Sequence, residues 1–195
     1  MREAEVKRLT KETNITVKLN LDESGEIKIK TGITFLNHLL TSFAFHGMLN
    51  LEVYAETIEK SKDHHLIEDV ALTLGQALSK ALGEKVGISR FGHAIVPMDE
   101  VLVLVSLDLS GRPYFKSNLK FKSENIEDFP SSMVNHFLRS LSYEGKFNLH
   151  VMVLRGGDDH HKAEAVFKAL GLSLKKAVKI EKNRKSDIPS TKGIC

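Results

Sequence analysis

The sequence is short of the features that define several large protein classes. Its single cysteine, Cys195, excludes an internal disulfide and any cysteine-based metal cage. Its apolar runs reach only about six residues, far below the ~20 that a membrane-spanning helix needs. Residues 1–8 are charged throughout and lack the apolar stretch of a signal peptide, so we expect a cytoplasmic protein.

Neither charge nor turn-forming residues dominate the 195-residue chain. A net charge of +3, spread along the sequence, gives no basic patch of the kind that binds nucleic acids. With four prolines and 13 glycines against 42% hydrophobic residues, the chain can bury a core and is not expected to be disordered. Its length fits one large domain or two small ones. Histidine is the residue type that stands out, with nine copies that include two His-His pairs.

The chain contains a diverged internal repeat. The clearest matching landmarks are Asn37-His38 with Asn135-His136, and Asp63-His64-His65 and Glu68 with Asp159-His160-His161 and Glu164. These landmarks and several hydrophobic ones keep the same order at nearly constant spacing, which a duplication explains and chance does not. We therefore expect two half-domains, residues 1–88 and 89–182, that share one core, followed by a tail, residues 183–195.

Hydropathy patterns predict the same elements in both halves. The first half reads as a β-hairpin of residues 15–21 and 26–30, a helix at 33–45, a strand at 49–54 and a helix at 64–82. The second half reads as strands at 101–108 and 114–121, a helix at 131–142, a strand at 147–154 and a helix at 160–180. This order predicts an α+β sandwich with helices packed on one face of each sheet.

The repeated histidines predict a metal centre. On a helix, His64 and Glu68 share a face because they are one turn apart, whereas His65 is turned about 100° from His64. Neighbouring rings that point apart suit two ions rather than one. The other candidate ligands are His38, His136, His160, His161 and Glu164. Such a nitrogen-rich, sulfur-free set suits a first-row divalent ion such as Mn, Fe, Co or Zn.

Pseudo-symmetry divides these ligands between two ions. One ion takes His64, Glu68, His136 and His161, and the other takes His38, His65, His160 and Glu164. Because His64 and His160 begin different helices, we do not expect one chain to bring all four groups of a set together. Asp63 and Asp159 are natural hydrogen-bond acceptors for the ligand rings. The remaining histidines do not recur in register and are not expected to be ligands: His46, His93 and His150.

Together with other motifs, these residues resemble the imidazoleglycerol-phosphate dehydratase family over essentially the whole chain. The matching stretches are Lys11-Glu12-Thr13, Phe35-Leu36-Asn37-His38, Asp63-His64-His65, Arg90-Phe91-Gly92, Pro97-Met98-Asp99-Glu100, Asp108-Leu109-Ser110-Gly111-Arg112-Pro113-Tyr114, His160-His161 with Glu164, Phe167-Lys168 and Pro189-Ser190-Thr191-Lys192-Gly193. The resemblance implies duplicated β-β-β-α-β-α repeats, like the second domain of ribosomal protein S5, with helices packed between two sheets. It also implies two Mn²⁺ ions per active site and a homo-oligomer of 24 subunits with active sites at subunit boundaries.

The implied reaction is a step of histidine biosynthesis, in which D-erythro-imidazole glycerol phosphate loses water to give imidazole acetol phosphate. The hydrogen removed is not acidic, because no carbonyl adjoins it, so a simple acid–base pair does not suffice. A substrate imidazolate held between two ions can expel the hydroxyl through the ring, and the resulting diazafulvene makes the next C–H acidic.

The resemblance assigns roles to further side chains. Glu12 matches the proton-transferring group; without the resemblance it reads as a solvated carboxylate. The phosphate-binding positions are matched by Arg90, Arg112, Lys168, Ser190 and Lys192. Asp99 and Glu100 are expected to be buried and paired with arginines. The chain departs from the usual family residues, with consequences for substrate affinity, at Asn37, Ser42, Lys62 and Asp158.

Two other functions compete with this interpretation. A dinuclear metallohydrolase normally carries carboxylate-rich bridges, whereas the eight candidate ligands include only two carboxylates. An RNA-binding module would fit the S5-like architecture, but the sequence has no clustered basic face and no aromatic platform.

Overall fold

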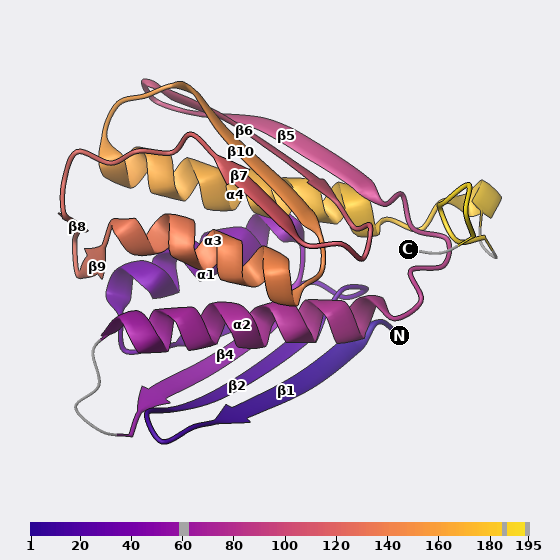
Figure 1. Cartoon of the computed structure of the whole chain (residues 1–195), viewed down its shortest axis with the longest axis horizontal. Coiled ribbons are helices and arrows are strands. Elements are labelled where there is room, and N and C mark those ends of the chain that lie inside the picture. The colour runs from indigo at the N-terminus through magenta and orange to yellow at the C-terminus, as the bar shows by residue number, and fades with distance from the viewer. Residues whose placement is uncertain (59–62, 185–186, 194–195) are drawn as a thin grey trace.

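The computed structural model of the chain describes residues 1–58, 63–184 and 187–193. Two four-stranded sheets enclose a layer of helices (Figure 1). The sheet orders, β1-β2-β4-β3 and β5-β6-β10-β7, are the same for the two halves. In each sheet the last edge strand, β3 or β7, runs parallel to its neighbour, and the other pairs are antiparallel. The predicted α+β fold with duplicated repeats is confirmed.

The elements have the following bounds. The strands are β1 (Glu3–Leu9), β2 (Thr13–Asn20), β3 (Ile27–Lys30), β4 (Asn50–Thr57), β5 (Phe91–Met98), β6 (Val101–Asp108), β7 (Tyr114–Ser117), β8 (Asn125–Ile126), β9 (Phe129–Pro130) and β10 (Asn148–Arg155). The helices are α1 (Thr34–Gly47), α2 (Asp63–Leu82), α3 (Ser132–Glu144), α4 (Asp159–Val178) and a short 3₁₀ helix, η1 (Lys182–Arg184). In each half, three strands of the four-stranded sheet precede the first long helix, as the family resemblance implies, and the second half adds the short pair β8 and β9 before α3.

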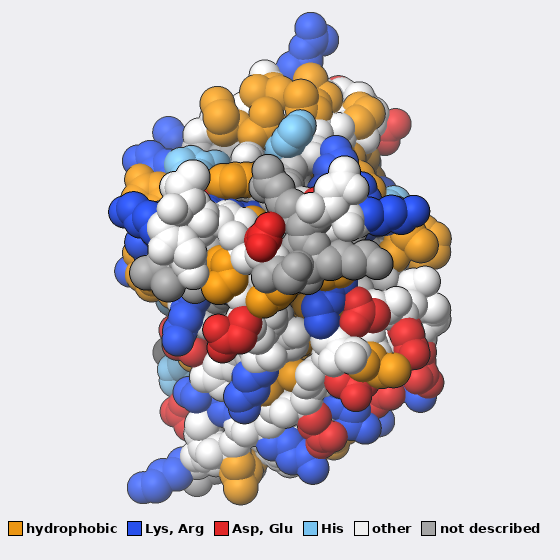
Figure 2. Space-filling view, turned by 90° about the vertical axis from the view of Figure 1, so that its right-hand side faces the viewer, with side chains coloured by type: hydrophobic (Ala, Val, Ile, Leu, Met, Phe, Trp, Pro, Cys, Tyr) orange, Lys and Arg blue, Asp and Glu red, His pale blue; other side chains and the backbone are white. Residues whose placement is uncertain are grey.

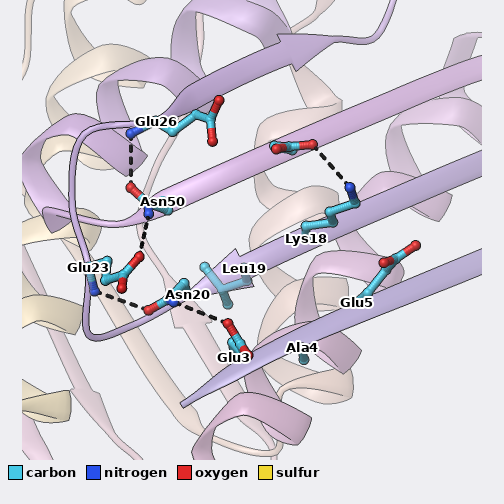
Figure 3. Close-up of a pocket in the computed structure, with 10 residues that line it drawn as sticks. Glu3, Ala4, Glu5, Lys18, Leu19, Asn20, Glu23, Glu26 and Asn50 are labelled. Carbon is cyan, nitrogen blue, oxygen red and sulfur yellow. Dashed lines mark hydrogen bonds and ion pairs between the residues drawn. The ribbon is translucent and has the colours of Figure 1, made fainter. Parts of the chain in front are cut away.

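The predicted hairpin of residues 15–21 and 26–30 is wrong, because β2 and β3 lie in one sheet with β4 between them. Two asparagines hold the connecting turn (Figure 3). The Asn20 side-chain oxygen accepts the backbone N–H groups of Asp22 and Glu23, and the Asn50 oxygen accepts that of Glu26. The turn thereby delivers β3 to the side of β4. The hairpin partner of β2 is β1, whose many charged residues hid its strand character.

The helix layer joins the two halves. The first-half helix α1 packs on α4, and α2 packs on the second-half helix α3. Gly171 lets α1 and α4 approach closely, since a Cβ there would lie 2.3 Å from the Phe43 carbonyl oxygen. Between α2 and α3, the Gln76 amide donates to the Glu144 carboxylate at 3.1 Å. Each helix pair therefore contains one helix from each half, and its members run side by side in the same direction.

The buried core lies between each sheet and the helices. Alternation along the strands buries Ile15, Val17 and Leu19 on β2 and Val101, Val103 and Val105 on β6. The outer faces of the sheets differ, because large apolar side chains such as Phe91, Ile95 and Met152 are exposed on the second sheet. At the end that carries the tail, hydrophobic side chains gather toward the second sheet and charged ones toward the first (Figure 2). None of the helices in the described parts of the chain is long and apolar enough to cross a lipid bilayer.

Asp69 ties α2 to the first hairpin and gives a test of the fold. Its carboxylate lies 2.8 Å from the Arg8 guanidinium and accepts the Thr13 hydroxyl at 2.5 Å, with only 11% of the Asp69 side chain exposed. Asp69→Ala leaves both donors without this partner, so we expect the free energy of unfolding to fall by about 3 kcal/mol. Urea denaturation of the metal-free protein measures the change.

The control for this prediction is Glu84→Ala, which removes a carboxylate from an exposed turn. We expect it to change the free energy of unfolding by less than about 0.5 kcal/mol. Equal losses in the two variants would contradict the proposed contribution of the Asp69 contacts.

Candidate metal and substrate site

One histidine of the first half meets two ligand candidates of the second. The Nε2 atom of His38, on α1, lies 3.1 Å from Oε2 of Glu164, and Nε2 of His160 lies 3.1 Å from the same oxygen. The donor atoms of all three residues lie within 4.8 Å of one another. His160 and Glu164 share a face of α4 because they are one helical turn apart. The pairing of α1 with α4 brings His38 to that face.

A second group has the halves exchanged. Nε2 of His136, on the second-half helix α3, lies 3.1 Å from Oε1 of Glu68, on the first-half helix α2. His64 is one turn before Glu68 on α2, and its ring centroid lies 4.1 Å from that of His65. Both groups therefore take side chains from both halves of the chain.

The donor atoms of these groups fit a divalent metal. Among the described residues, the buried His136 Nε2 and His65 Nδ1 atoms have no hydrogen-bond partner. Each nitrogen lies 3.1 Å from a carboxylate oxygen, of Glu68 or Glu12, without the alignment of a hydrogen bond, so both nitrogens can serve as donors to an ion. Imidazole nitrogens beside carboxylate oxygens, without sulfur, are the donors that first-row divalent ions take.

Charged neighbours keep the Glu164 carboxylate ionised. Burial alone would raise its pKa, but hydrogen bonds from Lys168 and His38 outweigh burial and lower the pKa to about 2. The Lys168 Nζ atom lies 2.8 Å from Oε1 of Glu164. The first group therefore holds an anionic ligand beside a lysine.

In His160 and His161, the ring nitrogen Nδ1 contacts a carboxylate that belongs to a loop. Nδ1 of His160 lies 3.0 Å from Glu127, and Nδ1 of His161 lies 3.2 Å from Glu100. A ring that donates through Nδ1 keeps the lone pair on Nε2, the atom that can bind a metal. The prediction that Asp159 accepts a hydrogen bond from a ligand ring is wrong. Its carboxylate accepts two loop N–H groups and pairs with Lys162.

Two departures from the usual family residues preserve contacts that position the histidines. The Asp158 carboxylate caps α4 by accepting the backbone N–H groups of His160 and His161. The Asn37 oxygen accepts the backbone N–H of Thr31 at 3.0 Å and its hydroxyl at 2.7 Å. Either acid or amide supplies these acceptor oxygens. Ser42 lies on α1, and no contact in the structure explains its departure. Lys62 lies outside the described residues.

His65 and His161 face the tips of the two sheet hairpins. Nδ1 of His65 lies 3.1 Å from Glu12, in the turn between β1 and β2. His161 faces the equivalent turn between β5 and β6, which holds Asp99 and Glu100. The expectation that these two acids are buried beside arginines is wrong, since their side chains are 75% and 48% exposed. Hydrogen bonds from the Asp158 N–H, from the backbone N–H of Glu100 itself and from His161 lower the pKa of Glu100 to about 2.

The candidate phosphate ligands divide between the two ends of the molecule. Lys168 belongs to the histidine end, through its contact with Glu164. Arg90 lies at the other end, where its backbone N–H donates to the carbonyl oxygen of Ala177 in the last turn of α4. At 1.5 Å per residue, Ala177 is about 25 Å along the helix axis from His160. The Arg90 guanidinium is paired with Asp108 and donates to the Pro189 carbonyl.

The C-terminal tail and Arg112 lie at the same end of the molecule as Arg90. Residues 187–191 and Gly193 border a hollow of about 820 Å³ beside Arg90 and Phe91. This end of the chain faces the viewer in Figure 2. The Ser190 hydroxyl accepts the N–H of Lys192, and the Arg112 carbonyl accepts the Asn148 amide near the end of β6. One chain therefore keeps Arg90, Arg112, Ser190 and Lys192 away from its own histidine groups.

The sequence interpretation missed the histidine contacts of two carboxylates, Glu127 and Glu100. Glu127 lies in a loop far along the chain from His160, and no sequence pattern links the two. The contact of Glu100 with His161 could have been predicted, because Glu100 occupies the tip of the β5–β6 hairpin as Glu12 occupies the tip of β1–β2. Aligning the two halves by their hairpins, and not by their histidines alone, would have paired Glu100 with Glu12.

Comparison with known proteins agrees with this arrangement. The family model for imidazoleglycerol-phosphate dehydratase matches residues 31–174. A protein of that name from Desulforudis audaxviator is 48% identical over 194 residues, covering 100% of this chain and 98% of the relative. One from Methanothermobacter thermautotrophicus is 50% identical over 193 residues, covering 99% and 97%. The chain belongs to the imidazoleglycerol-phosphate dehydratase family.

Solved structures of the family share the fold. The crystal structure of the Staphylococcus aureus enzyme has a TM-score of 0.83 and 32% identity, covering 92% of this chain and 99% of that one. The Pyrococcus furiosus enzyme, in complex with (S)-C348, has a TM-score of 0.84 and 38% identity, covering 97% and 100%. Family membership makes the chain a dehydratase, a hydro-lyase of histidine biosynthesis.

Proposed function

We propose that this dehydratase works at a dinuclear manganese site built between copies of the chain. The observation that supports this most strongly is the meeting of His38, His160 and Glu164, with His136 and Glu68 as their counterpart. His65 and His161 are turned toward the hairpin tips of their own chain, so we propose that a neighbouring copy completes each ligand set with them. The sets are those that pseudo-symmetry gives: His64, Glu68, His136 and His161 for one ion, and His38, His65, His160 and Glu164 for the other.

The substrate phosphate would bind the cations at the opposite end of a neighbouring chain. Arg112 and Lys192 supply positive charge there, the Ser190 hydroxyl supplies a donor, and Asp108 orients the Arg90 guanidinium. Lys168 would reach the same substrate from the histidine end. A site that needs both ends can hold imidazole and phosphate only when copies of the chain meet.

The proton that leaves carbon requires a base, and we assign this role to Glu12. Within the described residues, the one polar contact of its carboxylate is with His65, and 48% of the side chain is exposed. The carboxylate is therefore able to approach a substrate. The Mn²⁺ ions, when bound, would hold the imidazole ring and stabilise the negative charge that develops on it. The other groups of this chain position the substrate around that ring.

A metal-dependent assay with imidazole glycerol phosphate tests this proposal. Chelation should abolish formation of imidazole acetol phosphate and reduce the particle size measured by light scattering, because an ion shared between copies stabilises only the assembled state. Adding Mn²⁺ should restore both, at about two ions per chain by elemental analysis. A metal-free protein that keeps its full size and activity would contradict the proposal.

Three finer points stay predictions. The family resemblance implies 24 subunits, which light scattering of the Mn²⁺-loaded particle would measure. We also propose that the first repeat ends at residue 88, that the second begins at residue 89 and that the tail begins at residue 183. We further propose a cytoplasmic location for the protein.

A further inference from the structure

We propose that Glu100 is a positioning residue that fixes the ring of His161 so that its Nε2 atom is available to a metal ion. The orientation of the His161 ring is argued from hydrogen-bond geometry. Its effect on metal binding rests on the proposed metal centre. Glu100 and Glu12 occupy equivalent hairpin tips, yet the structure treats the two carboxylates differently.

Glu100 is held on both of its oxygens. Oε1 accepts the backbone N–H of Asp158 at 2.6 Å, and Oε2 lies 3.2 Å from Nδ1 of His161. Gly157 makes room for this carboxylate, because a Cβ at Gly157 would lie 2.1 Å from Oε1. The β5–β6 hairpin and the start of α4 therefore lock Glu100 in place.

Glu12 has no such lock within the described residues. Its carboxylate contacts Nδ1 of His65 at 3.1 Å, without the alignment of a hydrogen bond. One hairpin tip therefore carries a carboxylate that, among the described residues, no hydrogen bond holds and that is free to approach a substrate. The equivalent tip carries a carboxylate that is fixed. The duplication has given the same position two different uses.

The fixed carboxylate determines which nitrogen of His161 carries the proton. A carboxylate can only accept, so Nδ1 must donate to Glu100, and in the neutral ring Nε2 keeps its lone pair. About a third of the His161 side chain is exposed, which leaves it accessible to another copy of the chain.

Asp99, Glu100 and His161 also lie close enough together to resemble a separate metal group. The contacts argue against that reading, because Glu100 faces Nδ1 of His161 and the Asp158 N–H, whereas Asp99 faces the other ring nitrogen, Nε2. The Asp99 carboxylate stands 3.7 Å from Nε2 of His161, beyond hydrogen-bond range. The cluster is better explained as a device that orients His161.

Glu100→Gln is the discriminating variant. The glutamine oxygen can still accept the Asp158 N–H, so the turn should fold, but the amide then offers a donor to Nδ1 of His161. The ring must accept through Nδ1 and move its proton to Nε2, the atom that would bind the metal.

The first readout is the His161 tautomer in the metal-free protein, from ¹⁵N chemical shifts at pH ~8.5, where a histidine is neutral. His161→Gln identifies the signal. We expect the Nδ1–H form in the wild type and the Nε2–H form in Glu100→Gln. The second readout is Mn²⁺ affinity by calorimetry, which should fall about 10- to 100-fold in Glu100→Gln.

Asp99→Asn is the matched control in the same turn. Asp99 has a positive φ of 48°, which asparagine tolerates well, so the turn should be kept. We expect neither the tautomer nor the Mn²⁺ affinity to change. An unchanged tautomer in Glu100→Gln, or an equal shift in Asp99→Asn, would overturn the role of Glu100. A wild-type protein that binds no Mn²⁺ would overturn the proposed metal centre instead. The tautomer measurement would still show whether Glu100 orients the His161 ring.

Discussion

Two inactive variants of this chain should restore each other's activity when they are mixed. One variant, Glu12→Gln, is damaged at the histidine end, and the other, Arg112→Ala combined with Lys192→Ala, at the tail end. The start and the last turn of α4 are about 25 Å apart, so one chain cannot apply both ends to one substrate. Neither variant removes a candidate metal ligand, so both should still assemble.

The experiment uses metal removal to exchange subunits. Each variant is stripped of metal, the two are mixed in equal amounts, and Mn²⁺ is added back before the assay. If a site takes one end from each of two copies, about a quarter of the sites in a random mixture carry no substitution. Activity should therefore rise from background to about a quarter of the wild-type value.

The controls are the two variants stripped and reloaded separately, which should stay inactive. If the mixture also stays at background while its particle size matches the wild type, the two ends do not serve a shared site. The proposed boundary site would then be wrong.

Glu12→Gln alone should lower kcat about 10²- to 10⁴-fold, the usual contribution of a positioned proton-transfer group. Glutamine keeps the size of the side chain but cannot take up a proton. The KM and the Mn²⁺ content should change little, because the phosphate ligands and the metal donors are intact. Steady-state kinetics and elemental analysis measure these quantities.

Glu5→Gln is the control for this prediction, since it removes another partly exposed carboxylate of the same hairpin, on β1. We expect it to leave kcat unchanged. A Glu12→Gln enzyme with kcat within about threefold of the wild type would assign proton transfer to another group.

The sequence predicted the helices better than the strand pairing. Apolar residues at helical spacing located α2 within one residue, and Gly83, with a φ of 51°, follows its last residue. Strand order failed for residues 15–30, where two strands close in sequence do not pair. The reason lies in Asn50, on a later strand, which holds the turn by a contact that no local pattern encodes.

The part of the candidate site that could be predicted is the set of side chains that recur in both halves of the chain. Pseudo-symmetry placed His38 with His160 and Glu164, and the structure brings these three side chains together. The groups that orient the rings were not predictable in the same way. Glu127 reaches His160 from a distant loop, and Asp159, the neighbour in sequence, turns to the backbone of Lys122 and Ser123 instead. Such choices depend on how loops pack in three dimensions.

The exchange of helices between the halves has an evolutionary consequence. A single ancestral repeat would have carried one α1-like and one α2-like helix, but in this chain each donor group combines an early helix of one half with the late helix of the other. An unduplicated polypeptide could have formed such a group only by pairing with a second copy of itself. Gene duplication then joined the two partners covalently, and the histidines of each half have since depended on the other half for their counterparts.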